Sequence, residues 1–140
     1  MLFRSEDLDQ DELITHDNQW GSPEQDVLRR DFSINGLFYD PIENVVIDYV
    51  GGREDIQKGI LRTIGQAKLR FRQDPVRMLR LIKFEARFSY QANQEALDAL
   101  QECKEDILKS SPARVLEEIF RMLESGHSKA FFKQIGRAHV

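Results

Sequence analysis

The sequence lacks the residues that several classes of protein need. Its 140 residues include a single cysteine, Cys103, which excludes an internal disulfide and any zinc site built from several cysteines. No apolar run approaches the roughly 18 residues of a membrane-spanning helix, and no signal peptide is visible. The three histidines, His16, His127 and His139, share no spacing typical of a metal site. These absences indicate a cytoplasmic protein without a membrane anchor, with Cys103 as a buried or inert thiol.

Basic residues are scarce at the beginning of the chain. Residues 1–28 carry eight acids against Arg4 alone, a net charge of −7, whereas residues 53–87 carry ten bases and four acids, a net charge of +6. The total of −4 therefore conceals a strong asymmetry. A basic middle suggests a polyanionic partner, although a solvated helix face would give the same count.

The two ends fit their neighbours poorly. Residues 1–5 read MLFRS and residues 135–140 read IGRAHV, and the second string has no cap or periodicity of its own. Both strings resemble common sequencing-adapter DNA translated as protein. We therefore expect the native segment to cover about residues 6–134, cut from a longer gene.

Turn signals and apolar runs alternate in the first half of the chain. Residues 6–20 are polar and acidic and predict a loop, whereas Ser22 followed by Pro23 predicts a helix over residues 23–32. The apolar runs INGLFYD and NVVIDYV flank a turn and predict a β-hairpin. Residues 53–58 predict a short helix closed by glycine, and residues 60–64 predict another strand.

The second half is helical in pattern. Asp74 and Pro75 predict an N-cap and a first turn for a helix that reaches Phe88. Further helices are expected to begin near Asn93, Ser111 and Ser128. The helix that begins at Ser111 has apolar residues at positions 116, 119, 120 and 123, on one face. The fold class is therefore predicted as α+β, with a β-hairpin and flanking helices in residues 1–62 and an all-helical part in residues 63–140.

Two clusters in the first half are candidates for functional chemistry. In RRDFSIN, the forked guanidinium groups of Arg29 and Arg30 suit phosphate oxygens, and Asp31 and Asn35 suit ribose hydroxyls or a metal-bound phosphate. An exposed helix end with a local Arg–Asp pair is the structural alternative. The second cluster, DYVGGRED at residues 48–55, is better explained as turn structure than as a site.

A third cluster, RFRQDPVRMLRLIKF, begins at Arg70. Adenine and cytosine present an amino donor beside a ring-nitrogen acceptor, and the carboxylate of Asp74 with the guanidinium of Arg77 complements that pattern. Guanine and uracil place a carbonyl where the amino group should be, which would leave a buried polar group unpaired. The pair could thus select A and C over G and U, while Arg80 stacks on the base or holds a phosphate. An N-cap beside an ordinary basic surface is the alternative.

Together and in this order, RRDFSIN, DYVGGREDI and IGQAKLRFRQDPVRMLRLIKFEARF resemble the superfamily of bacterial poly(A) polymerases and CCA-adding tRNA nucleotidyltransferases. The resemblance covers about residues 18–134. It implies the C-terminal part of a polymerase-β-like palm followed by a helical neck and body. It also implies that Arg29, Arg30, Asp31 and Asn35 handle the ribose and triphosphate. Two positions depart from the family pattern: Ser33 replaces a more usual threonine, and Gln73 replaces a common acid.

The base-reading role of Asp74 and Arg77 is implied by the same resemblance. ATP would be the nucleotide substrate, an RNA 3′ end the partner, and magnesium the metal of the complete enzyme. The family holds magnesium with a Gly-Ser element and an Asp-x-Asp pair. The sequence has only Asp7-Leu8-Asp9, which we interpret as a chance match. We therefore expect the catalytic carboxylates to lie upstream, and this chain alone to be inactive.

Finer resemblance favours one branch of the superfamily. The run SSPARVLEEIFRMLESG, at residues 110–126, looks more like the poly(A) polymerases. The expected function is therefore template-independent addition of AMP from ATP to RNA 3′ ends. The alternatives are a CCA-adding enzyme and a non-catalytic RNA-binding protein that keeps the neck.

Overall fold

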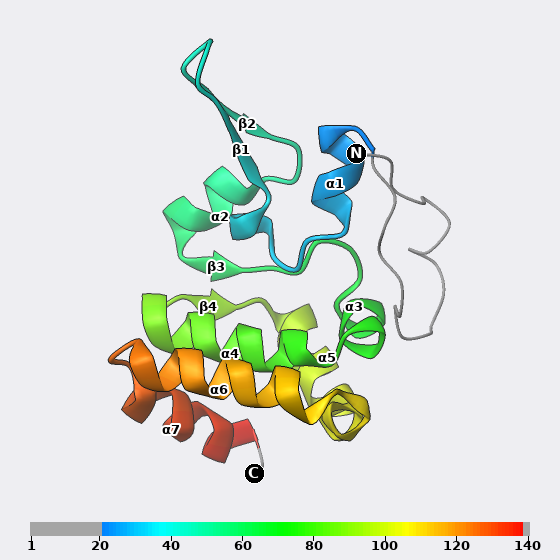
Figure 1. The fold of residues 1–140 in the computed structure, drawn as a ribbon, viewed down its shortest axis with the longest axis vertical. Helices are drawn as coiled ribbons and strands as arrows, with labels where there is room; N and C mark the ends of the chain where they lie inside the picture. Colours follow the sequence, from blue (N-terminus) through cyan, green and yellow to red (C-terminus); the bar gives the residue numbers. More distant parts are fainter. Residues whose placement is uncertain (1–20, 139–140) are drawn as a thin grey trace.

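A computed structural model describes residues 21–138 (Figure 1). The expectations for the loop at residues 6–20, for Asp7-Leu8-Asp9, and for His16 and His139 lie outside the described residues. Within the described part, no helix is both long and apolar enough to cross a bilayer.

The first helix, α1, is Pro23–Leu28. It begins as the sequence predicts, because Ser22 and Gln25 form a reciprocal capping box and Pro23 occupies the first turn. It ends four residues earlier than predicted, at Leu28. Phe32 instead makes an isolated antiparallel bridge with Thr63, and Ser33–Asn35 form a 3₁₀ turn, η2.

The predicted hairpin is present as β1 (Leu37–Asp40) and β2 (Val45–Asp48), paired antiparallel. The turn is closed by side chains, since the Asp40 carboxylate accepts the Ile42 amide at 2.9 Å and the Tyr39 hydroxyl donates to Asn44 at 2.6 Å. The hairpin projects away from the helices in Figure 1.

Helix α2 (Gly52–Lys58) follows directly and is closed by Gly59, whose φ is 67°. The Asp48 carboxylate accepts the amides of Val50, Gly52 and Arg53 at 2.9–3.1 Å, so it orders this turn as expected. Strand β3 (Ile60–Leu61) then pairs in parallel with β4 (Gln91–Ala92), which joins the two halves of the chain.

The second half contains five α-helices and a 3₁₀ segment. They are α3 (Ala67–Gln73), α4 (Val76–Phe88), α5 (Gln94–Cys103), η3 (Lys104–Lys109), α6 (Pro112–Glu124) and α7 (Ser128–Ala138). Asn93 caps α5, as predicted, and Gly126 ends α6 with a φ of 78°. A core cluster that includes Phe32, Phe71 and Leu81 joins these helices to β3 and to the segment after α1.

Three details differ from the sequence-based expectation. The Asp74 side chain makes no cap bond to α4, because it is bound from α6 instead. The apolar face predicted on α6 is not covered in the described part of the chain: Leu116, Phe120 and Leu123 are about half exposed. Helix α7 continues through residues 135–138, which had no predicted pattern.

Candidate functional site

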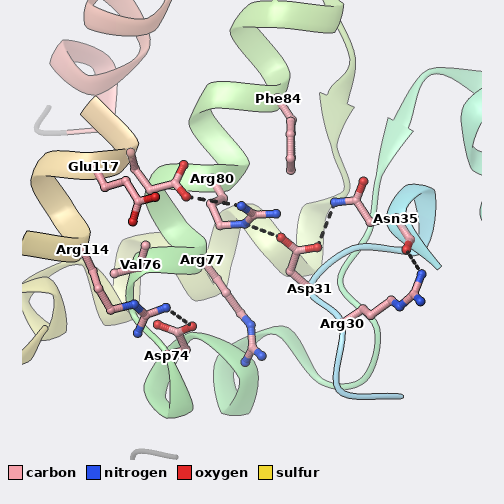
Figure 2. A pocket seen from close by; sticks show the side chains of 11 residues that line it. Arg30, Asp31, Asn35, Asp74, Val76, Arg77, Arg80, Phe84, Arg114 and Glu117 are labelled. Carbon is pink, nitrogen blue, oxygen red and sulfur yellow. Dashed lines mark hydrogen bonds and ion pairs between the residues drawn. The ribbon is translucent and has the colours of Figure 1, made fainter. Parts of the chain in front are cut away.

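An open pocket of about 470 Å³ lies between the segment after α1 and helices α4 and α6 (Figure 2). This volume is in the usual range for small-molecule sites. Its lining residues are Arg30, Asp31, Asn35, Asp74, Val76, Arg77, Arg80, Phe84, Arg114, Glu117 and Glu118. Six of the seven predicted site residues are thus brought together from two segments, residues 30–35 and residues 74–80. Arg29 is the exception, and the role of each residue stays a prediction.

The two adjacent arginines share the Asp26 carboxylate, but only Arg30 lines the pocket. Arg29 Nε donates to Asp26 at 2.7 Å, which is the local ion pair of the structural alternative. Arg30 donates to Asp26 Oδ2 and to the Asn35 carbonyl, both at 2.9 Å, and its guanidinium carbon lies 4.3 Å from the centroid of the Phe38 ring. Arg30 is therefore held at the pocket edge by partners on both sides.

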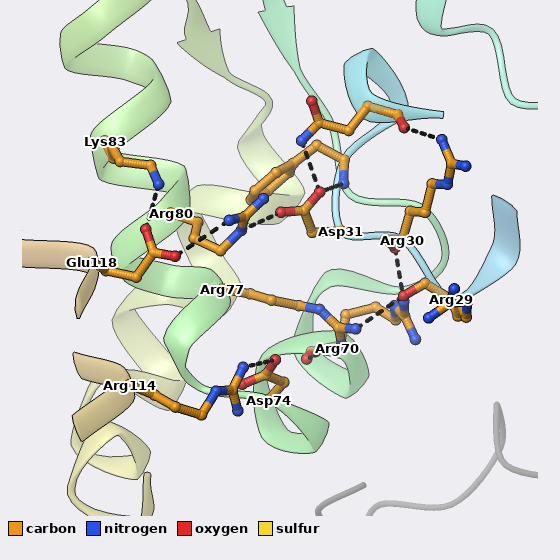
Figure 3. Close-up of polar contacts among 12 residues, drawn as sticks. Arg29, Arg30, Asp31, Arg70, Asp74, Arg77, Arg80, Lys83, Arg114 and Glu118 are labelled. Carbon is orange, nitrogen blue, oxygen red and sulfur yellow. Dashed lines mark hydrogen bonds and ion pairs between the residues drawn. The ribbon is translucent and has the colours of Figure 1, made fainter. Parts of the chain in front are cut away.

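Asp31 is the buried centre of the polar network in Figure 3. One carboxylate oxygen accepts from the Phe32 amide at 2.8 Å and from the Asn35 amide group at 2.9 Å. The other accepts from Arg80 Nε at 2.5 Å. Burial alone would raise the pKa of Asp31, but the charge of Arg80 and these hydrogen bonds outweigh it and lower the pKa. Asp31 is thus a fixed carboxylate that orients Asn35 and Arg80.

Arg80 continues the network into α6. Its Nη1 lies 3.3 Å from Glu118 Oε1, and the other oxygen of Glu118 pairs with Lys83 Nζ. Burial opposes ionisation of Glu118, but the hydrogen bond and charge of Lys83, together with Arg80, lower its pKa. The chain Asp31–Arg80–Glu118–Lys83 alternates in sign, so two mostly buried cations are compensated by two carboxylates.

Arg77 is buried and is held by the main chain. Its Nη1 donates to the Arg70 carbonyl and its Nη2 to the Arg29 carbonyl, both at 3.1 Å. A guanidinium has five N–H donors, so three remain after these two bonds. The main-chain anchors therefore fix the group without exhausting it.

Arg70, whose carbonyl accepts from Arg77, is itself only 2% exposed. It donates to the Arg30 carbonyl at 2.8 Å and to Gln73 Oε1 at 3.0 Å. Burial, and then the nearby charge of Arg77, lowers the pKa of Arg70 to about 10. Its Nε has no hydrogen-bond partner among the described residues.

Asp74 is the carboxylate of the predicted base-reading pair. Its Oδ2 accepts from Arg114 Nη2 at 2.8 Å, and its Oδ1 is buried without a hydrogen-bond partner among the described residues. The two members of the predicted pair thus face one pocket, each with another anchor (Figure 2). The unpaired Oδ1 of Asp74 therefore lies in the same pocket as the remaining N–H donors of Arg77.

The sequence did not single out Phe84, Arg114, Glu117 or Glu118 as site residues. Phe84 follows Arg77 by seven positions and Arg80 by four, so helical spacing places it on the same face of α4. Arg114, Glu117 and Glu118 lie in the run that was used only to distinguish the two branches of the superfamily. Arg114 binds Asp74, and Glu118 binds Arg80 and Lys83, across 35 to 40 positions of sequence, and no local pattern contains that information.

The cluster around Asp55 is structural, as the sequence suggested. Ser33 Oγ donates to Asp55 Oδ2, and Arg62 Nη2 lies 2.9 Å from the same oxygen. These contacts connect η2 and α2 to the residue that follows β3. The hydroxyl kept at Ser33 therefore supports the segment that carries Asp31 and Asn35.

A magnesium site was expected for the complete enzyme. Within residues 21–138, no three His, Cys, Asp or Glu side chains gather closely enough to hold a metal ion. The carboxylates of the pocket are occupied by arginines and lysine, as described above. The described residues therefore do not fit a magnesium ion, and no step through a metal follows from them.

Two family models match the chain. Residues 2–62 match the "Poly A polymerase head domain", and residues 91–139 match the "Probable RNA and SrmB- binding site of polymerase A". The chain is 37% identical over 131 residues to poly(A) polymerase I of Salmonella typhi, covering 94% of this chain and 28% of that protein.

CCA-adding enzymes are nearly as similar. The mitochondrial CCA tRNA nucleotidyltransferase of Candida glabrata is 35% identical over 142 residues, covering 99% of this chain and 27% of that protein. The crystal structure of the Bacillus stearothermophilus CCA-adding enzyme in complex with CTP matches with a TM-score of 0.72 and 32% identity, over 76% of this chain and 27% of that one.

The chain thus spans 28% of the length of the curated poly(A) polymerase that it matches. The fold is that of the polymerase-β-like nucleotidyltransferases, with the hairpin and helices arranged as in the CCA-adding enzymes. With its head and RNA-binding models, its relatives and its structural neighbours in agreement, the chain belongs to the superfamily of poly(A) polymerases and CCA-adding tRNA nucleotidyltransferases.

Proposed function

We propose that this protein takes part in template-independent adenylyl transfer, in which AMP from ATP is added to an RNA 3′ end. The pocket between the segment after α1 and helices α4 and α6 binds the incoming nucleotide. The attacking 3′-hydroxyl and the leaving pyrophosphate belong to the complete enzyme, together with the magnesium-binding carboxylates expected upstream.

The observation that carries the proposal is the unpartnered Oδ1 of Asp74 beside the anchored guanidinium of Arg77. A buried carboxylate oxygen without a donor is unfavourable until a ligand supplies one. The exocyclic amino group of adenine or cytosine is such a donor, and the remaining N–H groups of Arg77 can donate to the adjacent ring nitrogen. A guanine or uracil carbonyl would meet the carboxylate instead.

The opposite side of the pocket suits the ribose and the phosphates. Arg30 and Asn35 lie there on the segment after α1, with Asp31 between Asn35 and Arg80 (Figure 2). Arg30 keeps donors beyond its two hydrogen bonds, as Arg77 does. A nucleotide would span the pocket, with its base at Asp74 and its phosphates toward Arg30.

The test is nucleotide selection by the complete reading frame, with RNA primer, magnesium and one nucleotide at a time. Wild type is expected to extend the primer with ATP and to reject GTP and UTP. Asp74→Ala is expected to relax that selection by at least about tenfold, since an unpaired polar group no longer penalises the wrong base. An unchanged nucleotide profile would remove Asp74 from base reading. Glu54→Gln, at an exposed position of α2, is the matched control for loss of a carboxylate.

CCA addition is the second candidate function. It is supported by the 35% identity to a CCA tRNA nucleotidyltransferase and by the CTP-bound structural neighbour. The same Asp74–Arg77 chemistry accepts both cytosine and adenine. Long tails from ATP on a generic RNA would establish polyadenylation, whereas CTP incorporation followed by one ATP on a tRNA lacking its end would establish CCA addition.

A further inference from the structure

A second groove, of about 440 Å³, lies between α4 and α6. Four cationic side chains line it, namely Arg80, Lys83, Arg87 and Arg121, together with the carboxylate of Glu124. The Phe84 ring and Ser125 complete its walls. The lining is therefore net positive in a chain whose total charge is negative.

This groove lies next to the nucleotide pocket, since Arg80 and Phe84 line both. Along α4 the basic residues fall at positions 77, 80, 83 and 87, which the helical period places on one face. At a rise of 1.5 Å per residue, Arg77 and Arg87 are separated by about 15 Å along the axis. That length exceeds one nucleotide, since a stacked strand advances about 3.4 Å per nucleotide.

The four cations differ in how far their charge is already compensated. Arg80 and Lys83 are bound to Asp31 and Glu118, as described above. Arg121 pairs with Glu117 at 2.5 Å, but both side chains are more than half exposed, and exposed pairs contribute little. Within residues 21–138 Arg87 forms no ion pair, and its guanidinium carbon lies 5.4 Å from the centroid of the Phe88 ring. Arg87 and Arg121 are therefore available to an external anion.

We propose that this groove binds the phosphate backbone of single-stranded RNA adjoining the nucleotide pocket, through Arg87 and Arg121. The inference rests on the proposed function, because the RNA segment would be the one that ends beside the incoming nucleotide. The phosphates of a nucleoside triphosphate are the other source of the same chemistry. We assign the groove to RNA because of where the triphosphate would lie. In the proposed function the triphosphate is bound near Arg30, and Arg30 and α6 lie on opposite sides of Arg80 (Figure 2). The groove beside α6 is therefore on the side away from the triphosphate.

Contacts between arginine side chains and RNA phosphates depend on charge and do not distinguish one base sequence from another. Each phosphate neutralised on a single strand contributes about 0.7 to the slope of log affinity against log salt. Loss of Arg87 and Arg121 should therefore reduce that slope by about 1.4. Glu124 lines the groove with the opposite sign, so its neutralisation should act in the opposite direction.

The experiment measures fluorescence anisotropy of a labelled oligoadenylate with the 140-residue chain over a range of salt concentrations. Arg87→Ala and Arg121→Ala are each expected to weaken binding about tenfold, and the double variant to show the reduced slope. Lysine at either position should restore most of the affinity, because the charge is kept. Glu124→Gln should tighten binding about twofold. Arg53→Ala, an exposed arginine on α2, is the matched control and should change nothing.

Three outcomes overturn the assignment. An unchanged salt slope in the double variant removes the groove from RNA binding, and so does failure of the wild-type chain to bind the oligonucleotide. Weaker ATP binding in the double variant, with RNA binding unchanged, assigns the groove to the triphosphate. In each case the Asp74 selectivity experiment is unaffected, so failure of this inference is distinguishable from failure of the proposed function.

Discussion

Arg77 joins three segments with one side chain. Its two hydrogen bonds reach the carbonyl of Arg70 at the end of α3 and the carbonyl of Arg29 after α1. The bond to the Arg70 carbonyl is buried and the bond to the Arg29 carbonyl is part-buried, and a carbonyl that loses its partner away from water is unfavourable. Arg77 is therefore a structural residue of the pocket as well as a predicted base contact.

Arg77→Lys should destabilise the protein by about 1–3 kcal/mol, because a single ammonium group cannot reproduce the two-pronged contact with both carbonyls. Urea unfolding followed by circular dichroism measures the change. Arg137→Lys, at an exposed position of α7, should stay within about 0.5 kcal/mol of wild type. Equal stabilities for the two variants would show that the carbonyl contacts of Arg77 contribute nothing.

Gln73→Glu should raise the melting temperature by about 2–4 °C. Arg70 is buried beside Arg77 and donates to Gln73 Oε1 at 3.0 Å, so a carboxylate at this position would face a cation already removed from water. Its pKa would be lowered by that cation, and the gain should disappear as the pH falls below about 4. Differential scanning calorimetry at two pH values measures both effects.

Gln73→Met is the control, since it removes the acceptor at similar volume and should lower the melting temperature. A lower melting temperature for Gln73→Glu would mean that dehydration of the new carboxylate outweighs its attraction to Arg70.

The grouping of the predicted site residues followed from side-chain type and spacing, whereas their roles toward a ligand stay predictions. Asp74 and Arg77 were expected to face one ligand, and both line the pocket. The expected cap bond from Asp74 to α4 was wrong, because Arg114 binds that carboxylate from 40 positions away. Cap propensity is a local property, and a competing charge from a distant helix overrides it.

Among the elements, α2 is placed by an unusually close approach to η2. A β-carbon on Gly52 would lie 2.0 Å from the Ser33 carbonyl oxygen. The contact supports η2, which leads from Asp31 to Asn35. The position that a side chain at Gly52 would need is therefore already taken by the main chain of Ser33, which lies between Asp31 and Asn35.

Gly52→Ala should destabilise the protein by at least about 3 kcal/mol, since a main-chain atom has to move to relieve the overlap. Gly126→Ala is the matched control: a β-carbon there meets nothing within 4 Å, and only the positive φ of 78° is unfavourable. That variant should lose about 1 kcal/mol. Thermal unfolding measures the stability of both variants. A similar loss of stability in the two would contradict the packing explanation for Gly52.

Element starts and the hairpin followed from local signals. Ser22, Asn93 and the turn at residues 40–44 all act as predicted. The packing of α6 did not follow, since its periodic apolar face is largely exposed while Glu118 and Met122 are buried. Glu118 can lie inward because Lys83 and Arg80 compensate its charge. Periodicity detects an apolar face, but it does not reveal buried ion pairs.

For the whole molecule, the α+β order was predicted and is confirmed, whereas the boundary between residues 62 and 63 stays a prediction. The alternating charges of Asp31, Arg80, Glu118 and Lys83 connect the two predicted parts. Both carboxylates have pKa values lowered from ordinary values of 3.8 and 4.5. The stability that these two carboxylates contribute to the folded protein is therefore fully present at pH values above their ordinary pKa. It is lost as the pH falls through their lowered pKa values in the folded protein.

The urea midpoint should accordingly be nearly constant above about pH 5 and fall below about pH 4. Glu118→Gln should destabilise the protein by about 2–4 kcal/mol at pH 7, because two cations lose a partner, and its difference from wild type should shrink as the pH falls. Glu54→Gln, which breaks only an exposed pair with Lys58, should differ little from wild type at any pH. A Glu118→Gln deficit that persists in acid would exclude the charge explanation.

The alternating chain of charges also has a consequence for synthesis on the ribosome. Arg80 binds Asp31, made 49 residues earlier, and Glu118, made 38 residues later. At a rate of about 20 residues per second, Glu118 is added about 2 s after Arg80. During that interval the nascent chain carries the cations of α4 with only the first of their two carboxylates, so it is more attractive to nearby polyanions, ribosomal RNA included, than the finished protein.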